Sequence, residues 1–495
     1  MNPDGCRLCL LLFMHDDLKK DIVVAVKWSS VAEISAKLLT PVVSMVLARL
    51  LAPEAFGLVT SLVVIISFAE IFTDAGFHRY LIQHEFGSAA DLHRSSDVAF
   101  WCNLCLSILL WIIIFIFREP LATCVGSPNM GTALAVASLS IPLSAFSSIQ
   151  IALYKRTLDF RTLFNVRVVY VLVPLLVTLP LAFFLKNYWA LVIGTLSQNI
   201  VNALLLTYWS KWKPRLYFSF RELKEMLSFS LWSFFESISI WLTSYVDVFI
   251  VGTMLSQYYL GLYRTSSVLV GQILGLVTSV TTPILFSSLS RLQSDRESFF
   301  NLFFKFQKMV AMVAFPIGVI LFSYDELVTK ILLGEAWMEA SFFIGLWGLS
   351  SALMIVLSHY CSEIYRALGR PKLSVLAQWL HIIVLWPAVW FSVGYGFHML
   401  CWVRSSVRLE FIAVHLLIVW AVLKISPLKI SKNIVPSLFA AVLMFGMTYL
   451  LRCVGSSMTV QICSLCVSLL VYVGCVMIFP KERVLLFDLT KMVRR

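Results

Sequence analysis

The sequence predicts an all-α integral membrane protein with about fourteen membrane-spanning helices. Its composition gives the first indication, because 60% of the residues are hydrophobic and only 13% are charged. Soluble domains contain roughly 45–50% apolar and about 25% charged residues. Long apolar stretches throughout the chain give the second indication, and the placement of Lys and Arg between them gives the third. The net charge of +12 therefore fits cations kept in cytoplasmic loops, and no nucleic-acid partner is expected.

The apolar stretches are long enough to cross a bilayer, since a spanning helix needs about 20 mostly apolar residues. The first two stretches form a hairpin around Pro53, and the remaining ones follow, separated by short polar or basic connections. In chain order, the predicted spans are 22–50, 56–77, 96–117, 130–154, 163–185, 188–209, 227–253, 258–286, 302–323, 341–364, 373–395, 397–423, 433–452 and 459–479.

The connections alternate between basic and nearly uncharged segments. If the N-terminus lies inside, the inner segments hold roughly 28 Lys and Arg residues and the outer segments about 5. Cytoplasmic loops of membrane proteins retain such an excess of positive charge. We therefore predict a multi-pass protein of the bacterial cytoplasmic (inner) membrane with both termini in the cytoplasm.

A weak internal repeat predicts two related lobes. Leu47–Leu58 aligns with Val251–Leu262, about 204 positions later, and both segments contain a Gly-Leu pair at the same place. Repeats of this kind are typical of transporters, and an even number of spans per repeat predicts a pseudo-two-fold axis along the membrane normal. The predicted divisions are a cytoplasmic N-terminus at 1–21, an N-lobe at 22–209, a basic linker at 210–226, a C-lobe at 227–423, two further spans at 424–480 and a cytoplasmic tail at 481–495.

The first thirteen residues fit this topology poorly. Cys6–Met14 is apolar but too short to span a membrane. A start at Met14 gives a short charged head followed directly by the first span. We therefore expect Met14 to be the initiator and residues 1–13 to be absent from the native protein.

Six short motifs follow one another along the chain. They are Leu47–Gly57, Asp74–Gln83, Tyr154–Leu163, Tyr245–Gly252, Leu260–Ser266 and Arg366–Lys372. In their order and spacing, these motifs resemble the Wzx-type polysaccharide exporters, which belong to a large flippase superfamily that also contains multidrug antiporters and lipid II flippases. The resemblance covers roughly residues 15–425, and the nearest subgroup is that of the colanic-acid and teichuronic-acid exporters.

The resemblance implies a substrate and a mode of action. The substrate would be an oligosaccharide on a polyprenyl pyrophosphate carrier, moved by alternating access for surface polysaccharide or lipopolysaccharide biosynthesis. Polysaccharide polymerase and glycosyltransferases would be partners, together with membrane lipids, and the protein would act as a monomer. No cofactor is implied, although proton or sodium coupling fits this class.

Charged residues inside spans are the candidate site residues, because each costs about 2.5–3.5 kcal/mol on insertion scales. Cations that could contact the pyrophosphate are Lys37, Arg264, Arg404 and Arg408. Other interpretations remain open. Lys37 is four residues from Glu33 and could form a structural pair with it, Arg264 could reach the outer interface, and the two arginines of span twelve could form a local ion pair across helices.

Three carboxylates are candidates for carrying a coupling ion: Glu33, Glu236 and Asp247. Glu236 lies almost where the repeat offset would place Glu33. Asp247 lies near the outer end of its span, so an interfacial residue without a transport role is the alternative interpretation.

Two other functions compete with the exporter hypothesis. A multidrug or cationic-drug antiporter would need an acidic cavity, whereas cations rival the acids inside these spans. A membrane polymerase or glycosyltransferase would need a sizeable extramembrane catalytic loop, but the longest outer loop, near 324–341, is short. No phosphate-binding glycine loop or nucleophile elbow is present in the sequence. Three Cys-x-x-Cys spacings occur, at Cys6/Cys9, Cys102/Cys105 and Cys463/Cys466, but no His flanks them at metal-ligand spacing. We therefore expect a transporter without enzymatic activity, catalytic residues or a bound metal.

Overall fold

The computed structural model describes residues 39–74, 77–157, 159–370, 372–452 and 457–485. Throughout these ranges the regular elements are helices, and no strand occurs. Thirteen of the described helical segments are long and apolar enough to cross a membrane. The prediction of an all-α membrane protein is confirmed. The predicted first span, 22–50, lies mostly outside the described residues, and Leu39–Leu50 is its described helical part.

The chain forms two compact units, which we describe separately. The first contains Met1–Leu51 and Ser61–Ile238, and the second contains Ala52–Thr60 and Ser239–Arg495. Of the three boundaries, the one at 51/52 lies just before α3 (Pro53–Asp74), the one at 60/61 lies inside α3, and the one at 238/239 lies inside α12 (Phe220–Met254). The predicted lobes at 22–209 and 227–423, with a linker at 210–226, stay a prediction.

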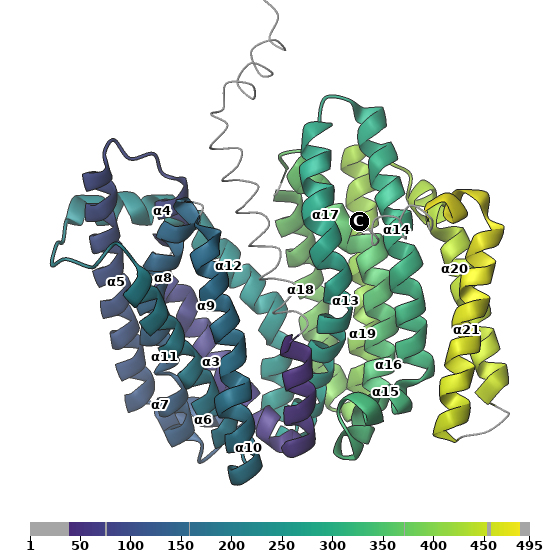
Figure 1. Cartoon of the computed structure of the whole chain (residues 1–495), viewed down its shortest axis with the longest axis horizontal. Helices are drawn as coiled ribbons and strands as arrows, with labels where there is room; N and C mark the ends of the chain where they lie inside the picture. Colours follow the sequence, from purple (N-terminus) through teal and green to yellow (C-terminus); the bar gives the residue numbers. More distant parts are fainter. Residues whose placement is uncertain (1–38, 75–76, 158, 371, 453–456, 486–495) are drawn as a thin grey trace, which may run out of the picture. The chain divides into compact units, whose positions relative to one another are not determined.

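The first unit is built from helices that follow α3 (Figure 1). Ser88 caps one of them by accepting a hydrogen bond from the Asp91 amide, and Asp159 caps another through the Thr162 amide. Such caps satisfy amides that have no partner within the helix. The helices are α4 (Phe77–Gln83), α5 (Ala89–Ile116), α6 (Arg118–Cys124), α7 (Gly131–Ala137), α8 (Ser140–Arg156), α9 (Phe160–Val173), the π-helical η1 (Pro174–Thr178), α10 (Leu179–Leu185) and α11 (Trp189–Trp209).

The second unit contains the longer helices of the C-terminal half (Figure 1). Asp295 caps α14 by accepting from the amides of Glu297 and Ser298. The elements are α13 (Gln257–Arg291), α14 (Arg296–Ser323), α15 (Asp325–Leu332), the 3₁₀-helical η2 (Glu335–Ala340), α16 (Ser341–Met354), the π-helical η3 (Ile355–His359), α17 (Tyr360–Ala367), α18 (Lys372–Val393), α19 (Phe397–Leu423), α20 (Pro427–Arg452) and α21 (Met458–Ile478).

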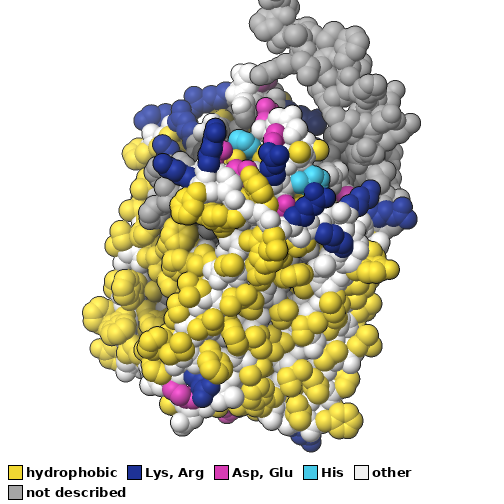
Figure 2. All heavy atoms as spheres, turned by 90° about the vertical axis from the view of Figure 1, so that its left-hand side faces the viewer, with side chains coloured by type: hydrophobic (Ala, Val, Ile, Leu, Met, Phe, Trp, Pro, Cys, Tyr) yellow, Lys and Arg dark blue, Asp and Glu magenta, His cyan; other side chains and the backbone are white. Residues whose placement is uncertain are grey.

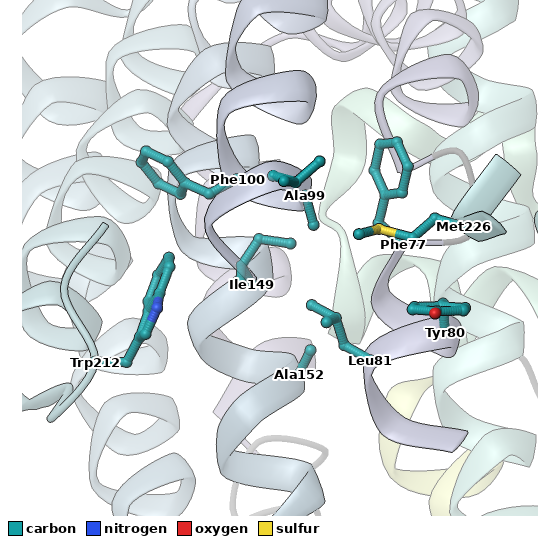
Figure 3. Packing of buried hydrophobic residues seen from close by; sticks show 10 residues of the cluster. Phe77, Tyr80, Leu81, Ala99, Phe100, Ile149, Ala152, Trp212 and Met226 are labelled. Carbon is teal, nitrogen blue, oxygen red and sulfur yellow. The ribbon is translucent and has the colours of Figure 1, made fainter. Parts of the chain in front are cut away.

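A buried apolar cluster holds together one end of the first unit (Figure 3). It joins α4, α5, α8, the segment after α11 and the start of α12. Polar contacts surround it, since the Arg156 guanidinium donates to the Leu81 and His84 carbonyls and the Asp97 carboxylate accepts from the Arg215 amide. The described connections of the first unit that are predicted to lie inside thus contribute to one packed end. The labelled members of the cluster are Phe77, Tyr80, Leu81, Ala99, Phe100, Ile149, Ala152, Trp212 and Met226.

The surface in Figure 2 shows how charge is distributed on one face of the molecule. Hydrophobic side chains cover most of that face, and Lys and Arg side chains gather at one end. A broad apolar band next to a basic rim is typical of a membrane protein whose charged loops lie on one side.

The two repeated segments contact each other directly, within the second unit. A Cβ atom on Gly57 of α3 would lie 1.8 Å from the Gln257 carbonyl oxygen, and one on Gly261 of α13 would lie 1.9 Å from the Pro53 carbonyl oxygen. The offset between Gly57 and Gly261 equals the offset between Pro53 and Gln257, so each repeated segment contacts the other in the same way. The two glycines of the repeat therefore lie where α3 and α13 cross closely.

Candidate functional site

A buried ion pair links α12 to α19 in the second unit. The Arg404 Nε donates to Asp247 Oδ2 at 2.8 Å, and both side chains are less than a tenth exposed. The Tyr263 hydroxyl of α13 donates to the same oxygen at 2.5 Å and lies 3.1 Å from Arg404 Nε. Asp247 Oδ1 accepts from the Val248 amide at 2.8 Å. The carboxylate thus has a partner on each oxygen, as a buried charge requires.

A second arginine lies one helical turn further along α19. The Arg408 guanidinium carbon is 3.1 Å from the centroid of the Trp347 ring, and that of Arg404 is 4.7 Å from the same ring. Arg408 also donates to the Ser351 hydroxyl. Both contacts come from α16, so Trp347 lies against two guanidinium groups at once, an arrangement favoured by cation–π attraction.

The arginine cluster, defined as Arg404, Arg408, Asp247, Tyr263 and Trp347, carries an excess of positive charge. Asp247 neutralises Arg404, and no acidic residue of the described chain forms an ion pair with Arg408. Arg408 is half-buried, and a guanidinium that is partly withdrawn from water without a carboxylate is favoured by a nearby anion or water. The cluster is therefore suited to an anionic group.

A line of polar and aromatic side chains continues along α19. His381 Nδ1 of α18 lies 2.8 Å from Glu410 Oε2, and the His381 ring lies 4.3 Å from that of Phe411. Further on, the Tyr365 hydroxyl of α17 donates to the His415 carbonyl at 3.2 Å. Buried polar groups that satisfy one another in this way fix the packing of neighbouring helices.

Of the other predicted site residues, only Arg264 has a described side chain, and it is not part of this cluster. Arg264 follows Tyr263 in α13, but successive residues on a helix point in different directions, and its guanidinium carbon lies 5.1 Å from the Tyr245 ring centroid. Glu236 belongs to α12, and its side chain is outside the described part of the structure. Glu33 and Lys37, like the expected start at Met14, lie outside the described residues.

The structure gives Asp247 a partner within the second unit, and its interpretation as a residue near the outer interface stays open. Its side chain is buried and paired with Arg404 across two helices. For Arg404, this pair agrees with the alternative interpretation in which the arginines of span twelve form an ion pair across helices. The roles proposed for Arg404, Arg408 and Asp247 in transport stay predictions.

The first unit has a polar cavity of its own, with a volume of about 480 Å³. Lys155 and Arg167 line it together with Asn199 and Asn202. The nearby Glu70 of α3 accepts a hydrogen bond from Ser144 at 3.4 Å. Sugars are bound by such mixtures of amide and charged groups, because each can donate to or accept from hydroxyls.

Sequence reasoning missed two members of the cluster, Tyr263 and Trp347, and the neighbouring Ser351. These are ordinary residues for an apolar span, and 14% of the chain is aromatic, so nothing distinguished them. The pairing of Asp247 with Arg404 joins residues 157 positions apart, and no local pattern indicates such a distant partner.

Comparison with known proteins identifies the family of this chain. The family described as "Polysaccharide biosynthesis protein" matches residues 46–342, which is more than half of the chain. The chain belongs to this polysaccharide biosynthesis family. The resemblance to Wzx-type exporters found in the sequence is thus confirmed at the family level.

Two relatives in sequence and one solved structure match the chain over most of its length. The chain is 23% identical to a membrane protein in the cps region of Klebsiella pneumoniae, with 76% of this chain and 77% of that protein covered. It is 24% identical to the succinoglycan biosynthesis transport protein ExoT of Rhizobium meliloti, with 68% and 67% covered. Among solved structures, the lipid II flippase MurJ in an inward closed conformation matches with a TM-score of 0.72 at 15% identity, covering 92% of this chain and 99% of MurJ. The chain therefore shares the fold of MurJ.

Proposed function

We propose that this family member moves lipid-linked oligosaccharides across the bacterial cytoplasmic membrane for the assembly of a surface polysaccharide. The family match over residues 46–342 is the observation that carries the proposal. The relative named as a succinoglycan biosynthesis transport protein supports transport as the activity, and the fold shared with a lipid II flippase supports a lipid-linked substrate.

The physical task explains why such a protein needs polar groups inside an apolar fold. The polyprenyl tail can remain in the bilayer, where each buried CH₂ contributes about 0.8 kcal/mol. Only the pyrophosphate and the sugars must be shielded from hydrocarbon while they cross. A cavity that opens to one side at a time provides this shield.

The arginine cluster supplies the chemistry for the anionic part of the substrate. A guanidinium can bind phosphate oxygens through two parallel hydrogen bonds. Arg408, whose partners are a hydroxyl and an aromatic ring, is the cation of the cluster that is free of a carboxylate. We assign it the phosphate contact, with Arg404, Arg264 and Lys37 as further candidates.

Ion coupling is the second part of the proposal. Asp247, Glu33 and Glu236 are candidates for binding a proton or sodium ion. For Asp247, binding a cation must weaken its pair with Arg404, and Arg404 would then need another anion. The pyrophosphate could be that anion, so arrival of substrate and uptake of a cation would be linked.

The experiment is export in cells combined with flipping in vesicles. A bacterial strain that lacks its own exporter of this family, supplied with this gene and the matching glycosyltransferases, should regain surface polysaccharide and lose its accumulated lipid-linked precursor. Unchanged precursor accumulation despite membrane insertion of the protein would contradict the proposal. Reconstituted flipping that ignores both proton and sodium gradients would remove only the coupling hypothesis.

The multidrug antiporter is the competing function within the same superfamily. A cationic drug would be repelled by a cluster with two guanidinium groups and one carboxylate. Drug resistance of cells expressing the protein should therefore match that of cells with an empty vector.

A further inference from the structure

A basic cavity lies far along the chain from the arginine cluster, where α14 and α20 meet the segment after α21. Its volume is about 540 Å³. Lys305 and Lys308 of α14 line it together with Lys481, and Phe304 and Val484 provide apolar walls. Lys308 lies one helical turn from both Phe304 and Lys305, since residues three and four apart are neighbours on a helix.

The walls of this cavity are fixed by polar contacts. The Asn433 amide of α20 donates to the Phe304 carbonyl at 2.9 Å and to Gln307 Oε1 at 3.0 Å. Lys308 Nζ lies 2.9 Å from Glu482 Oε1, and the Glu482 side chain is only 4% exposed. These contacts hold α20 and the segment 480–485 against α14, so the cavity is a built feature of the fold.

The charge of the cavity is positive. Glu482 neutralises Lys308. Lys305 and Lys481 are exposed and form no ion pair with any acidic residue in the described part of the chain. Lys429 adds a further cation, with its Nζ 5.3 Å from the Phe304 ring centroid. These lysines belong to the connections predicted to lie on the cytoplasmic side.

The surroundings are apolar and outward-facing. Val435 and Phe439 of α20 are each 51% exposed, and Ile478 at the end of α21 is 76% exposed. A ligand here would meet lysines at one end and hydrocarbon-facing side chains at the other. We propose that this cavity binds the phosphate headgroup of an anionic phospholipid of the cytoplasmic leaflet, whose acyl chains lie along α20 and α21. Basic pockets between membrane helices bind anionic lipid headgroups through the same forces.

Lipid binding by the purified full chain tests this proposal without reference to transport. The protein in detergent is titrated with phosphatidylglycerol, with phosphatidylcholine and with inorganic phosphate, and bound species are counted by native mass spectrometry. We expect phosphatidylglycerol to bind, and Lys305→Ala/Lys481→Ala to weaken its binding roughly twenty-five-fold, since each lysine near an anionic headgroup contributes about a factor of five. Neither residue is the partner of Glu482, so folding should be retained.

Two matched variants complete the experiment. Lys211→Ala/Lys224→Ala removes the same charge from exposed positions of the first unit and should leave phosphatidylglycerol binding unchanged, while Lys305→Arg/Lys481→Arg should retain it. Equal binding of phosphatidylcholine, or equal weakening by both alanine pairs, would overturn the proposal. Inorganic phosphate that binds as tightly as phosphatidylglycerol and displaces it would overturn the assignment to a lipid and identify a soluble phosphate site.

Discussion

At the scale of single residues, the arginine cluster contains a balanced pair, Arg404 with Asp247, and an unbalanced charge, Arg408, which has no ion-pair partner among the described residues. Asp247 and Arg404 neutralise each other in a buried position, with Tyr263 as a third partner. Arg408 has only the Ser351 hydroxyl and the Trp347 ring among the described residues. Removing one member of the balanced pair leaves a buried charge, whereas removing Arg408 removes an unbalanced one. The two kinds of substitution should therefore act on different properties.

Asp247→Asn should destabilise the protein strongly. Arg404 would remain buried without its carboxylate, and breaking a buried pair from one side costs about 3–5 kcal/mol. Tyr263→Phe removes one donor to that carboxylate and should cost about 1–3 kcal/mol. The thermal midpoint of unfolding in detergent measures both. As a control, Arg221→Ala breaks an ion pair whose side chains are 90% and 56% exposed and should leave the midpoint unchanged. Equal midpoints for all three variants would contradict a structural role for the buried pair.

Arg408→Ala should lower export of polysaccharide by at least about tenfold while leaving the thermal midpoint within a few degrees of wild type. A lost charged hydrogen bond to substrate costs roughly 1.5–3 kcal/mol. Arg408→Lys should restore export only in part, because an ammonium cannot bind phosphate through a planar fork. Surface polysaccharide per cell is the readout, normalised to the amount of protein in the membrane. Arg118→Ala, on a helix of the first unit, serves as the matched control, and equal export by Arg408→Ala and this control would remove Arg408 from the site.

At the scale of elements, α3 and α13 approach each other more closely than any other helices do at a described glycine. A Cβ atom on Gly57 would meet the Gln257 carbonyl, and one on Gly261 would meet the Pro53 carbonyl. Only a residue without a Cβ fits at either position, since real Cβ atoms do not lie below 3 Å from a backbone oxygen. Small residues at such crossings let backbones pack closely inside a membrane, where van der Waals contact drives helix association.

Gly57→Ala and Gly261→Ala should each destabilise the protein by about 1–3 kcal/mol, because the helices must separate to admit the methyl group. The matched control is Gly446→Ala on α20, where no described atom lies within 4 Å of the added Cβ. That substitution should be neutral or slightly stabilising, by at most about 1 kcal/mol, since alanine favours helix over glycine. Thermal midpoints in detergent compare the three variants. A control that loses as much stability as Gly57→Ala would argue against the crossing as the cause.

At the scale of the whole molecule, the distribution of charge sets the expected orientation. The positive residues of the predicted inner connections include Arg156 and Arg215, which the structure holds at one packed end of the first unit. Arg118 and Lys186 lie in the predicted outer connections. Cytoplasmic retention of Lys and Arg predicts which end faces inward.

Reporter fusions should confirm this orientation. Alkaline phosphatase, which is active only outside the cytoplasm, should be active when fused after Ser127, between α6 and α7. It should be inactive when fused after Lys213, between α11 and α12, where green fluorescent protein should fluoresce instead. Fusions at the C-terminus should behave like those after Lys213. The opposite pattern at both loops would reverse the predicted topology and place the basic cavity at the outer surface.

The sequence by itself determined the class of protein, the positions of the described spans and the family resemblance. These depend on local composition: a run of apolar residues such as 397–423 predicts a helix regardless of its neighbours, and the structure has it at Phe397–Leu423. Lys and Arg in loops likewise predict orientation one connection at a time. Short motifs in a fixed order were sufficient for the family.

The tertiary structure decided which charges meet. Asp247 and Arg404 are far apart in sequence and come together only because α12 and α19 pack side by side. The partners of Arg408 lie on a third helix, and those of Lys308 lie after the last span. The sequence could not distinguish these charged residues from one another. The free-energy cost of burying a charge depends on the residue that faces it across a helix interface. Periodicity within one helix carries no information about that facing residue.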